Sequence, residues 1–238
     1  MKGIILAGGN GSRLSPITNV TSKQLLPVYN KPMIYYPLET LINGGIKEIL
    51  IIIAPNYAGH FLNLLGSGSE WDVKITYEIQ EEPKGIAEAF LLGDTFIGKD
   101  NVALILGDNI FEDDFSHTIR NFSGGAHIFC KKVSDSQRFG VVTFDKKGNV
   151  LSIEEKPESP TSDYAQAGFY LYDNSVIEKA RRLSPSPRGE FEITDISNLY
   201  LKENNITSSV IDGAWFDCGT PDSLLEASNY VQGKYCSH

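Results

Sequence analysis

The sequence predicts an α/β fold in which a Rossmann-like sheet, mainly parallel but mixed, is flanked by helices. Short runs rich in Ile, Val and Leu alternate with segments of helical periodicity over the first half of the chain. The run over residues 49–54 has no polar alternation, which is typical of a parallel strand covered on both faces. Strands that alternate with helices imply βαβ units with right-handed crossovers, and ligands bind such sheets at the carboxyl ends of the strands.

In the first half of the chain, apolar runs predict strands and the segments between them predict helices. The first helix is expected to begin at Pro32, because proline suits a first helical turn, and to end before the Gly44–Gly45 pair. The expected strands cover residues 3–7, 48–54, 73–79 and 102–106, and the expected helices cover residues 32–43, 57–65 and 86–96.

After about residue 125 the pattern changes, and strands are joined by short loops. Residues 145–149 predict a hairpin-type loop, and Asn174 is the expected N-cap of a helix. The expected strands cover residues 126–132, 140–144, 150–154, 169–172 and 206–211, and the expected helices cover residues 174–182, 193–203 and 223–231. Neither a repeat nor a linker interrupts the pattern, so we expect one domain over residues 1–238.

Composition excludes several classes of function. The chain has 238 residues, 21 basic against 30 acidic, and a net charge of -9, which disfavours binding of a nucleic acid polymer. No run approaches the ~20 apolar residues of a membrane span, and the apolar run over residues 4–7 is too short for a signal peptide. Three cysteines without a CxxC pair favour a reducing compartment. We therefore expect a cytoplasmic protein without a membrane partner.

A glycine-rich loop directly follows the first expected strand. Gly8, Gly9 and Gly11 leave backbone N–H groups free to face a ligand, and Arg13 and Lys23 follow. This pattern favours a phosphate cradle with two cations, although a tight turn between a strand and a helix has similar glycines. It is not a Walker A loop, since no Gly-Lys-Ser/Thr ends it, and the third glycine of a dinucleotide fingerprint is missing.

The glycine loop is the first of several segments that together resemble the sugar-1-phosphate nucleotidyltransferase family. Residues 6–14 and 23–28 look like that family's signature, and residues 31–38 are close to its glucose-1-phosphate thymidylyltransferase branch. Further similar blocks follow in order at residues 106–109, 138–142, 154–157, 185–190, 192–195 and 217–220. The resemblance implies the nucleotide-diphospho-sugar transferase type of α/β fold, with a nucleotide-binding part over about residues 1–125 and a sugar-binding part over about residues 126–238.

The resemblance also implies a reaction. In the family, an oxygen of a sugar 1-phosphate attacks the α-phosphorus of a nucleoside triphosphate in line, and pyrophosphate leaves. For this chain it implies dTTP and glucose 1-phosphate as substrates, dTDP-glucose as product and Mg²⁺ as cofactor. The metal ion is assigned to Asp108, which follows an apolar strand, and to Asp217. Two carboxylates with phosphate oxygens and water suit Mg²⁺. Asp108 by itself is more typical of an N-cap or an Asx-turn after a strand, and Asp217 by itself is typical of a loop carboxylate before Gly219.

The implied catalytic residues are Arg13, Lys23, Asp108 and Lys156. Arg13 is similar to the arginine that grips the triphosphate, and Lys156 to the lysine that binds the sugar phosphate. Gln80 corresponds to a glutamine that reads the pyrimidine edge, since a carboxamide offers a donor and an acceptor. The implied nucleotide-binding residues are Leu6, Gly8, Gly9, Gly11, Ser12, Arg13, Lys23, Gln24, Gln80, Gly85 and Asp108, and the implied sugar-binding residues are Asn109, Gly140, Glu155, Lys156, Gln166, Gly168 and Trp215.

Some positions depart from the family pattern. Gln166-Ala167-Gly168 stands where thymidylyltransferases commonly have Val-Thr-Gly, in a segment that lines the family's sugar pocket, so the identity of the sugar stays open. Ser12 replaces a threonine but keeps the hydroxyl group. The chain ends at His238, before the C-terminal segment that helps to form the feedback site of the long-form enzymes. The resemblance is therefore to a short form, in which we expect feedback inhibition to be absent or altered.

Three other functions compete with this interpretation. An enzyme of the same family would use UTP, or another hexose or amino-sugar 1-phosphate. A non-catalytic sensor would bind nucleotide sugars on the same fold, although a sensor has no need of two metal carboxylates. A nicotinamide-dependent dehydrogenase is disfavoured by Leu14, which occupies the third glycine position of the dinucleotide fingerprint. The family also implies a homo-oligomer, either a tetramer or a dimer.

Overall fold

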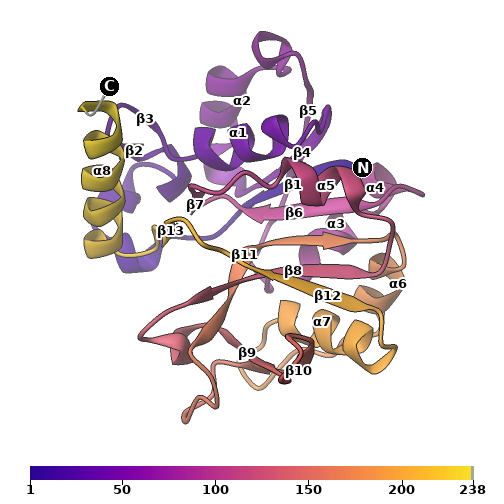
Figure 1. Cartoon of the computed structure of the whole chain (residues 1–238). Coiled ribbons are helices and arrows are strands. Elements are labelled where there is room, and N and C mark those ends of the chain that lie inside the picture. The colour runs from indigo at the N-terminus through magenta and orange to yellow at the C-terminus, as the bar shows by residue number, and fades with distance from the viewer. Residues whose placement is uncertain (237–238) are drawn as a thin grey trace.

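A mixed sheet of nine strands runs through the protein, and the computed structural model describes residues 1–236 (Figure 1). The strands pair in the order β10-β9-β11-β6-β1-β4-β5, while β8 pairs with β11 and with β12. Their bounds are β1 Lys2–Ala7, β4 Glu48–Ile53, β5 Lys74–Ile79, β6 Val102–Leu106, β8 Ala126–Lys132, β9 Gly140–Phe144, β10 Val150–Glu155, β11 Tyr164–Tyr172 and β12 Ile206–Val210. The predicted α/β class with a mainly parallel, mixed sheet is confirmed.

The four strands β6, β1, β4 and β5 form the parallel centre of this sheet. The apolar side chains of β1, β4 and β6 are buried on both faces, as the unbroken run in β4 predicts, whereas β5 lies at the edge of the sheet and is partly exposed. β11 joins β6 antiparallel and makes the sheet mixed. Because β1, β4, β5 and β6 run in the same direction, their carboxyl ends meet at one edge, where the loops after them gather.

Helices cover both faces of the sheet, and each face has its own apolar core. On one face α1 (Tyr35–Asn43), α2 (Ala58–Leu65) and α5 (Ser116–Asn121) pack over the sheet. On the other face lie α3 (Glu88–Leu92), α6 (Val176–Arg181) and α7 (Ile193–Lys202), together with the short α4 (Asp94–Ile97). Short 3₁₀ turns occur at Ser12–Leu14, Ile17–Asn19, Lys23–Leu25, Pro55–Tyr57, Ser69–Trp71 and Ser136–Arg138.

The C-terminal helix α8 (Pro221–Cys236) lies at one side of the molecule (Figure 1). It packs through a third, small apolar cluster on the hairpin of β2 (Pro27–Val28) and β3 (Lys31–Pro32). Among the helices formed by residues 1–236, none is long and apolar enough to cross a bilayer.

A second small sheet has no clear signal in the sequence. β7 (Asn109–Phe111) pairs antiparallel with β13 (Trp215–Asp217), and Asp217 lies opposite Asn109. Each strand has only three residues, which is too short for a periodic pattern. This pairing brings the loop before α8 to the end of β6, and so it determines the geometry of the site described below.

Several expected boundaries were wrong. The first helix begins at Tyr35 and not at Pro32, because Lys31–Pro32 pairs with β2. β11 begins at Tyr164 and not at residue 169, because β8 and β9 pair with its first residues. The segment 86–96 divides into α3 and α4 at Gly93, and the last helix covers residues 221–236 rather than 223–231.

The expected N-cap at Asn174 is also wrong. Ser175 is the N-cap residue of α6, and its side chain makes no capping hydrogen bond. The Asp173 carboxylate instead accepts the backbone N–H of Ser175 at 3.0 Å. The carboxylate of Asp173, one position earlier, therefore has the capping role that the sequence predicted for Asn174.

A histidine buried between two strands predicts a dependence of stability on pH. His127 on β8 lies between the hydroxyls of Thr207 and Ser209 on β12, at 2.8 and 3.0 Å. Burial lowers the pKa of His127 to about 4 from its usual 6.5. The unfolded chain therefore takes up a proton first as the pH falls below 6.5, and stability is lost between there and about pH 4. Between about pH 7.5 and about pH 5, we expect the free energy of unfolding of the wild-type protein to fall by about 2 kcal/mol more than that of His127→Gln. Urea unfolding of both proteins at the two pH values measures this difference.

Candidate active site

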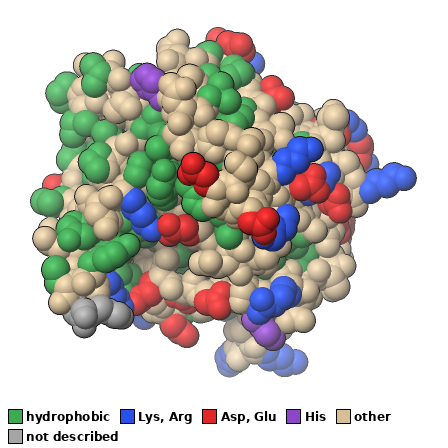
Figure 2. Space-filling model, turned by 90° about the horizontal axis from the view of Figure 1, so that it is seen from above, with side chains coloured by type: hydrophobic (Ala, Val, Ile, Leu, Met, Phe, Trp, Pro, Cys, Tyr) green, Lys and Arg blue, Asp and Glu red, His purple; other side chains and the backbone are tan. Residues whose placement is uncertain are grey.

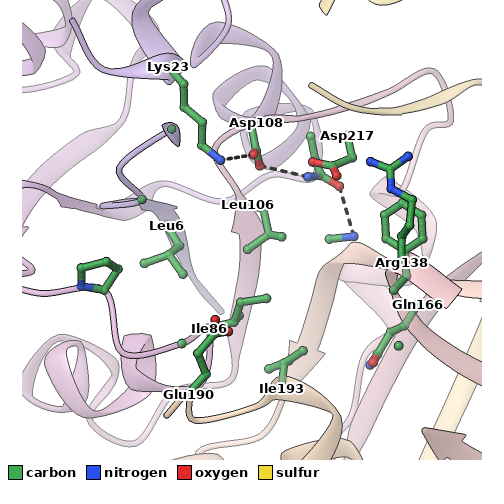
Figure 3. A pocket seen from close by; sticks show the side chains of 18 of the residues that line it. Leu6, Lys23, Ile86, Leu106, Asp108, Arg138, Gln166, Glu190, Ile193 and Asp217 are labelled. Atoms are coloured by element: carbon green, nitrogen blue, oxygen red, sulfur yellow. Dashed lines mark hydrogen bonds and ion pairs between the residues drawn. The ribbon is translucent and has the colours of Figure 1, made fainter. Parts of the chain in front are cut away.

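One large cavity, of about 770 Å³, opens at the carboxyl ends of β1 and β6 and extends to β9, β10 and β11 (Figure 3). Every residue that the sequence assigned to the nucleotide, the sugar or the metal lines this cavity, with the exception of Gly8. Gly8 lies directly behind the wall, since a Cβ atom there would be 2.1 Å from Oε1 of Gln80. Segments from both halves of the chain therefore meet around a single space.

The loop after β1 forms the phosphate end of the cavity. Gly11 has a φ of 60°, a left-handed conformation that glycine adopts without strain, and its carbonyl oxygen accepts hydrogen bonds from Leu14 N and Thr18 Oγ1. Two cations approach this loop. The ammonium of Lys23 lies next to Gly9, and the guanidinium of Arg13 packs against the backbone of Gly219.

Two carboxylates face the same end of the cavity. The pairing of β7 with β13 brings Asp217 next to Asp108, although they lie far apart in the chain (Figure 3). The Asp108 carboxylate contacts the Lys23 ammonium and accepts a hydrogen bond from Asn109 Nδ2 at 3.1 Å. Among residues 1–236, no hydrogen bond or ion pair reaches the carboxylate of Asp217.

Burial and neighbouring charges shift the pKa values of Asp108, Lys23 and Asp217. Burial would raise the pKa of Asp108, but attraction by Lys23 and hydrogen bonds from Lys23 and Asn109 together outweigh it, and the pKa lies below its ordinary value. Burial would lower the pKa of Lys23, but the charge of Asp108, the hydrogen bond to it and the charge of Asp217 together raise that pKa above its ordinary value. Burial first, and then repulsion by Asp108, raise the pKa of Asp217 to about 6. Asp217 is thus a carboxylate whose negative charge lacks a direct partner.

The carboxylate pair fits a divalent cation. No cluster of three or more His, Cys, Asp or Glu side chains that could hold a metal occurs within residues 1–236, so the protein by itself offers few ligands. Mg²⁺ typically takes one or two carboxylates and completes its shell with phosphate oxygens and water. A cation between Asp108 and Asp217 would also remove the repulsion that raises the pKa of Asp217.

A mixed polar and apolar wall follows the end of β5. Gln80 is 3 % exposed, and its Nε2 donates to Glu88 Oε2 at 2.7 Å, which fixes the carboxamide. Leu6, Leu106 and Ile86 provide apolar surface nearby (Figure 3). Such a slot, with one oriented amide between aliphatic side chains, suits a flat heterocycle.

Gly85 in this wall has a structural role that the sequence did not indicate. Its φ is +107°, and a Cβ atom there would lie 2.5 Å from the carbonyl oxygen of Phe191 and 2.6 Å from its nitrogen. The resemblance assigns this glycine to the approach of a base. The structure adds that only glycine fits against the loop before α7.

Gly85→Ala is therefore expected to destabilise the protein more than an ordinary left-handed glycine does. Gly148→Ala is the matched control, since Gly148 has a φ of +85° and open space around the position of a Cβ. We expect Gly148→Ala to lower the free energy of unfolding by about 1 kcal/mol and Gly85→Ala to lower it by about 1–3 kcal/mol more. Urea unfolding measures both values. Equal losses in the two variants would contradict this steric account.

The opposite wall carries the residues assigned to the sugar. Thr194 Oγ1 donates to Glu155 Oε2 at 3.0 Å, and the Lys156 ammonium lies 3.5 Å from Glu155 Oε1. Lys156 has a φ of 41°, which is uncommon for a side chain with a Cβ and is a form of strain often found at functional sites. Asn109 Oδ1 accepts hydrogen bonds from Trp215 Nε1 at 2.7 Å and from Gly168 N at 3.2 Å.

Several lining residues were missed by the sequence analysis. Arg138 lies next to Asp217 in Figure 3, and its positive charge lowers the pKa of that carboxyl. Its guanidinium stacks over Phe139, which in turn packs against Trp215. Arg138 lies inside a quoted block, 138–142, but no local signal distinguished it from a surface arginine. The other missed lining residues are Asn10, Pro83, Ile86, Leu106, Phe139, Tyr170, Glu190 and Ile193.

The sequence model of the nucleotidyl transferase family matches residues 2–234 of this chain. The chain belongs to the nucleotidyl transferase family. Curated glucose-1-phosphate thymidylyltransferases from Neisseria gonorrhoeae and Mycolicibacterium smegmatis are 50% and 51% identical to it over 238 residues. These matches cover 98% of the chain and 83% and 82% of the two relatives.

Solved structures agree with this nucleotidyl transferase in fold. A Bacillus anthracis protein, described as a candidate glucose-1-phosphate thymidylyltransferase in complex with a sucrose, has a TM-score of 0.93 and 46% identity. That match covers 98% of this chain and 95% of the other. A UDP-glucose pyrophosphorylase complexed with UDP-glucose has a TM-score of 0.85 and 25% identity, with 98% of both chains covered. This nucleotidyl transferase is therefore an enzyme of a family that generally uses a divalent metal ion.

Proposed function

We propose that this nucleotidyl transferase transfers a thymidylyl group from dTTP to glucose 1-phosphate and releases dTDP-glucose and pyrophosphate. The observation that carries the proposal is the position of Asp108 and Asp217 between the glycine loop and the sugar wall of one cavity. The name shared by relatives at about 50% identity supports the choice of substrates.

The phosphate end of the cavity suits a triphosphate. Backbone N–H groups of the glycine loop, with Arg13 and Lys23, provide positive potential around one end of the cavity. An oxygen of the sugar 1-phosphate attacks the α-phosphorus, the bond to the β-phosphate oxygen breaks, and pyrophosphate leaves with the electron pair. Arg13 and Lys23 are oriented before the reaction and stabilise the charge that grows on the phosphoryl oxygens.

Asp108 and Asp217 would hold Mg²⁺, which when bound supplies positive charge to phosphate oxygens and helps to orient them. Lys23 contacts Asp108, so one cation links the carboxylate pair with the triphosphate end. Lys156 approaches from the sugar wall and counters the repulsion between the two anionic substrates. The residues themselves thus hold both substrates and keep their phosphates at one place.

The remaining walls would select the base and the sugar. Gln80, held by Glu88, presents a carboxamide edge to a pyrimidine, and the missing side chain of Gly8 leaves room for that carboxamide. Asn109, Gly140, Glu155, Gln166, Gly168 and Trp215 line the part of the cavity that we assign to the pyranose. Gln80 cannot distinguish thymine from uracil, so UTP is the nucleotide alternative.

A matrix of substrates tests the proposal. Pyrophosphate release is measured for dTTP, UTP, ATP and GTP against glucose 1-phosphate, galactose 1-phosphate, glucosamine 1-phosphate and N-acetylglucosamine 1-phosphate, with Mg²⁺ present. We expect dTTP with glucose 1-phosphate to be the preferred pair. Preference for UTP or for an amino sugar would identify the alternative enzyme, and dTTP binding without any turnover would identify a sensor.

We further propose that the enzyme works in the cytoplasm as a homo-oligomer. All three cysteines, at residues 130, 218 and 236, are free thiols, which suits a reducing compartment. Apolar side chains gather on the α8 side of the face shown in Figure 2, and Leu225 and Tyr235 on α8 are 61% and 54% exposed. Light scattering coupled to gel filtration decides between the expected oligomer and a monomer.

A further inference from the structure

One buried polar atom lacks a partner. Among the side chains of residues 1–236, Oε1 of Gln166 is the only buried nitrogen or oxygen without a hydrogen bond. Gln166 is 4% exposed and comes from the first half of β11. Buried polar atoms are nearly always paired, so an unpaired one in a cavity wall points to a ligand.

The rest of the side chain is held firmly. Nε2 of Gln166 donates to Ser197 Oγ at 2.9 Å, and Ser197 Oγ lies 2.9 Å from the hydroxyl of Tyr172. Both partners are fully buried. This network determines the direction of the carboxamide and leaves its second polar atom on the other side.

That second atom lies in the sugar wall. Gly140 has no side chain, and the position of its missing Cβ lies 3.1 Å from Oε1 of Gln166 and 2.6 Å from the methyl group of Thr194. Thr194 in turn holds Glu155 by a hydrogen bond. Gly140, Glu155 and Gln166 all line the cavity, and Gln166 lies on the side away from Lys23 in Figure 3.

We propose that Gln166 is a specificity-determining residue whose free carboxamide atom bonds one hydroxyl group of the pyranose ring. The inference rests on the proposed function and extends it from the class of substrate to a single recognition contact. A hydroxyl group can donate to the oxygen or accept from the nitrogen, so it satisfies the carboxamide in either orientation. A substrate without that hydroxyl leaves the buried atom unpaired, and the enzyme rejects it.

The experiment combines removal of the Gln166 amide group from the protein with removal of single hydroxyl groups from the sugar. The kcat/KM is measured for wild type and Gln166→Met with glucose 1-phosphate and with its 2-, 3-, 4- and 6-deoxy analogues. Methionine has a similar length and no amide group. We expect wild type to use one of the four analogues about 10- to 100-fold less well than glucose 1-phosphate. Gln166→Met loses a similar factor on glucose 1-phosphate and no longer distinguishes that one analogue from it.

Tyr172→Phe is the matched control, because it removes another group of the same buried network and leaves both polar atoms of Gln166 in place. It is expected to keep the wild-type ranking of the five sugars. Equal losses of Gln166→Met on all five sugars, or no change in the ranking, would overturn the inference, since a purely structural role affects all substrates alike.

Binding of the same five sugars to wild type and Gln166→Met is measured in parallel by calorimetry. If no nucleotide sugar forms from dTTP, the proposed function fails. The inference is then decided by binding alone, where a preference that Gln166→Met abolishes supports it and an unchanged preference overturns it.

Discussion

Asp217→Asn is expected to lower kcat/KM for nucleotidyl transfer by about 10³-fold and to leave the protein folded. The carboxylate of Asp217 makes no hydrogen bond within residues 1–236, so asparagine, which has nearly the same shape, removes only a charge. The Asp217 carboxylate is one of the two proposed metal ligands. The other, the Asp108 carboxylate, already forms an ion pair with Lys23. Turnover is measured by pyrophosphate release over a range of Mg²⁺ concentrations.

The same variant is expected to gain stability when divalent metal is absent. In EDTA, burial and the repulsion of Asp108 make the Asp217 carboxylate costly to ionise, and asparagine removes that cost. We expect a Tm in EDTA that is higher by a few degrees, on the order of 1 kcal/mol or more. Asp163→Asn is the control, since Asp163 is exposed and only pairs loosely with Lys132, at 4.0 Å. An Asp217→Asn enzyme with wild-type activity and unchanged Mg²⁺ dependence would rule out the metal role.

Lys156→Met is expected to raise the KM for glucose 1-phosphate strongly and to leave the KM for dTTP within about twofold. Lys156 is the lysine that follows β10 on the sugar wall, and the loss of one desolvated contact between a cation and a phosphate costs about 10²-fold in kcat/KM. The uncommon φ of 41° at this residue directs its side chain and gives a reason to expect a role beyond surface charge.

Lys132→Met removes a lysine outside the cavity, whose side chain is 67% exposed, and serves as the control. Steady-state kinetics with each substrate varied in turn separate the two KM values. Equal effects on both KM values would mean that Lys156 affects the whole site rather than the sugar phosphate. Unchanged kinetics would mean that Lys156 is only a solvated charge at the end of a strand.

The sequence by itself determined the α/β class and the position of the phosphate loop. These features depend on local chemistry: an apolar run in β4 reports burial on both faces, and Gly8, Gly9 and Gly11 report a loop whose backbone can face a ligand. The resemblance in ordered motifs predicted the family and most of the residues that line the cavity, including Asp108 and Asp217. It could do so because those motifs come from loops at the same edge of the sheet.

Only the tertiary structure decided how these residues meet. Three-residue strands have no periodic signal, so the β7–β13 pairing that brings Asp217 to Asp108 could not be predicted from local pattern. The contact of Gly85 with Phe191, the place of Arg138 beside Asp217 and the unpaired oxygen of Gln166 likewise depend on segments far apart in the chain. Local sequence reports what each segment prefers by its own covalent geometry and polarity, whereas the distances and charges of a site arise between segments that meet only when the chain folds.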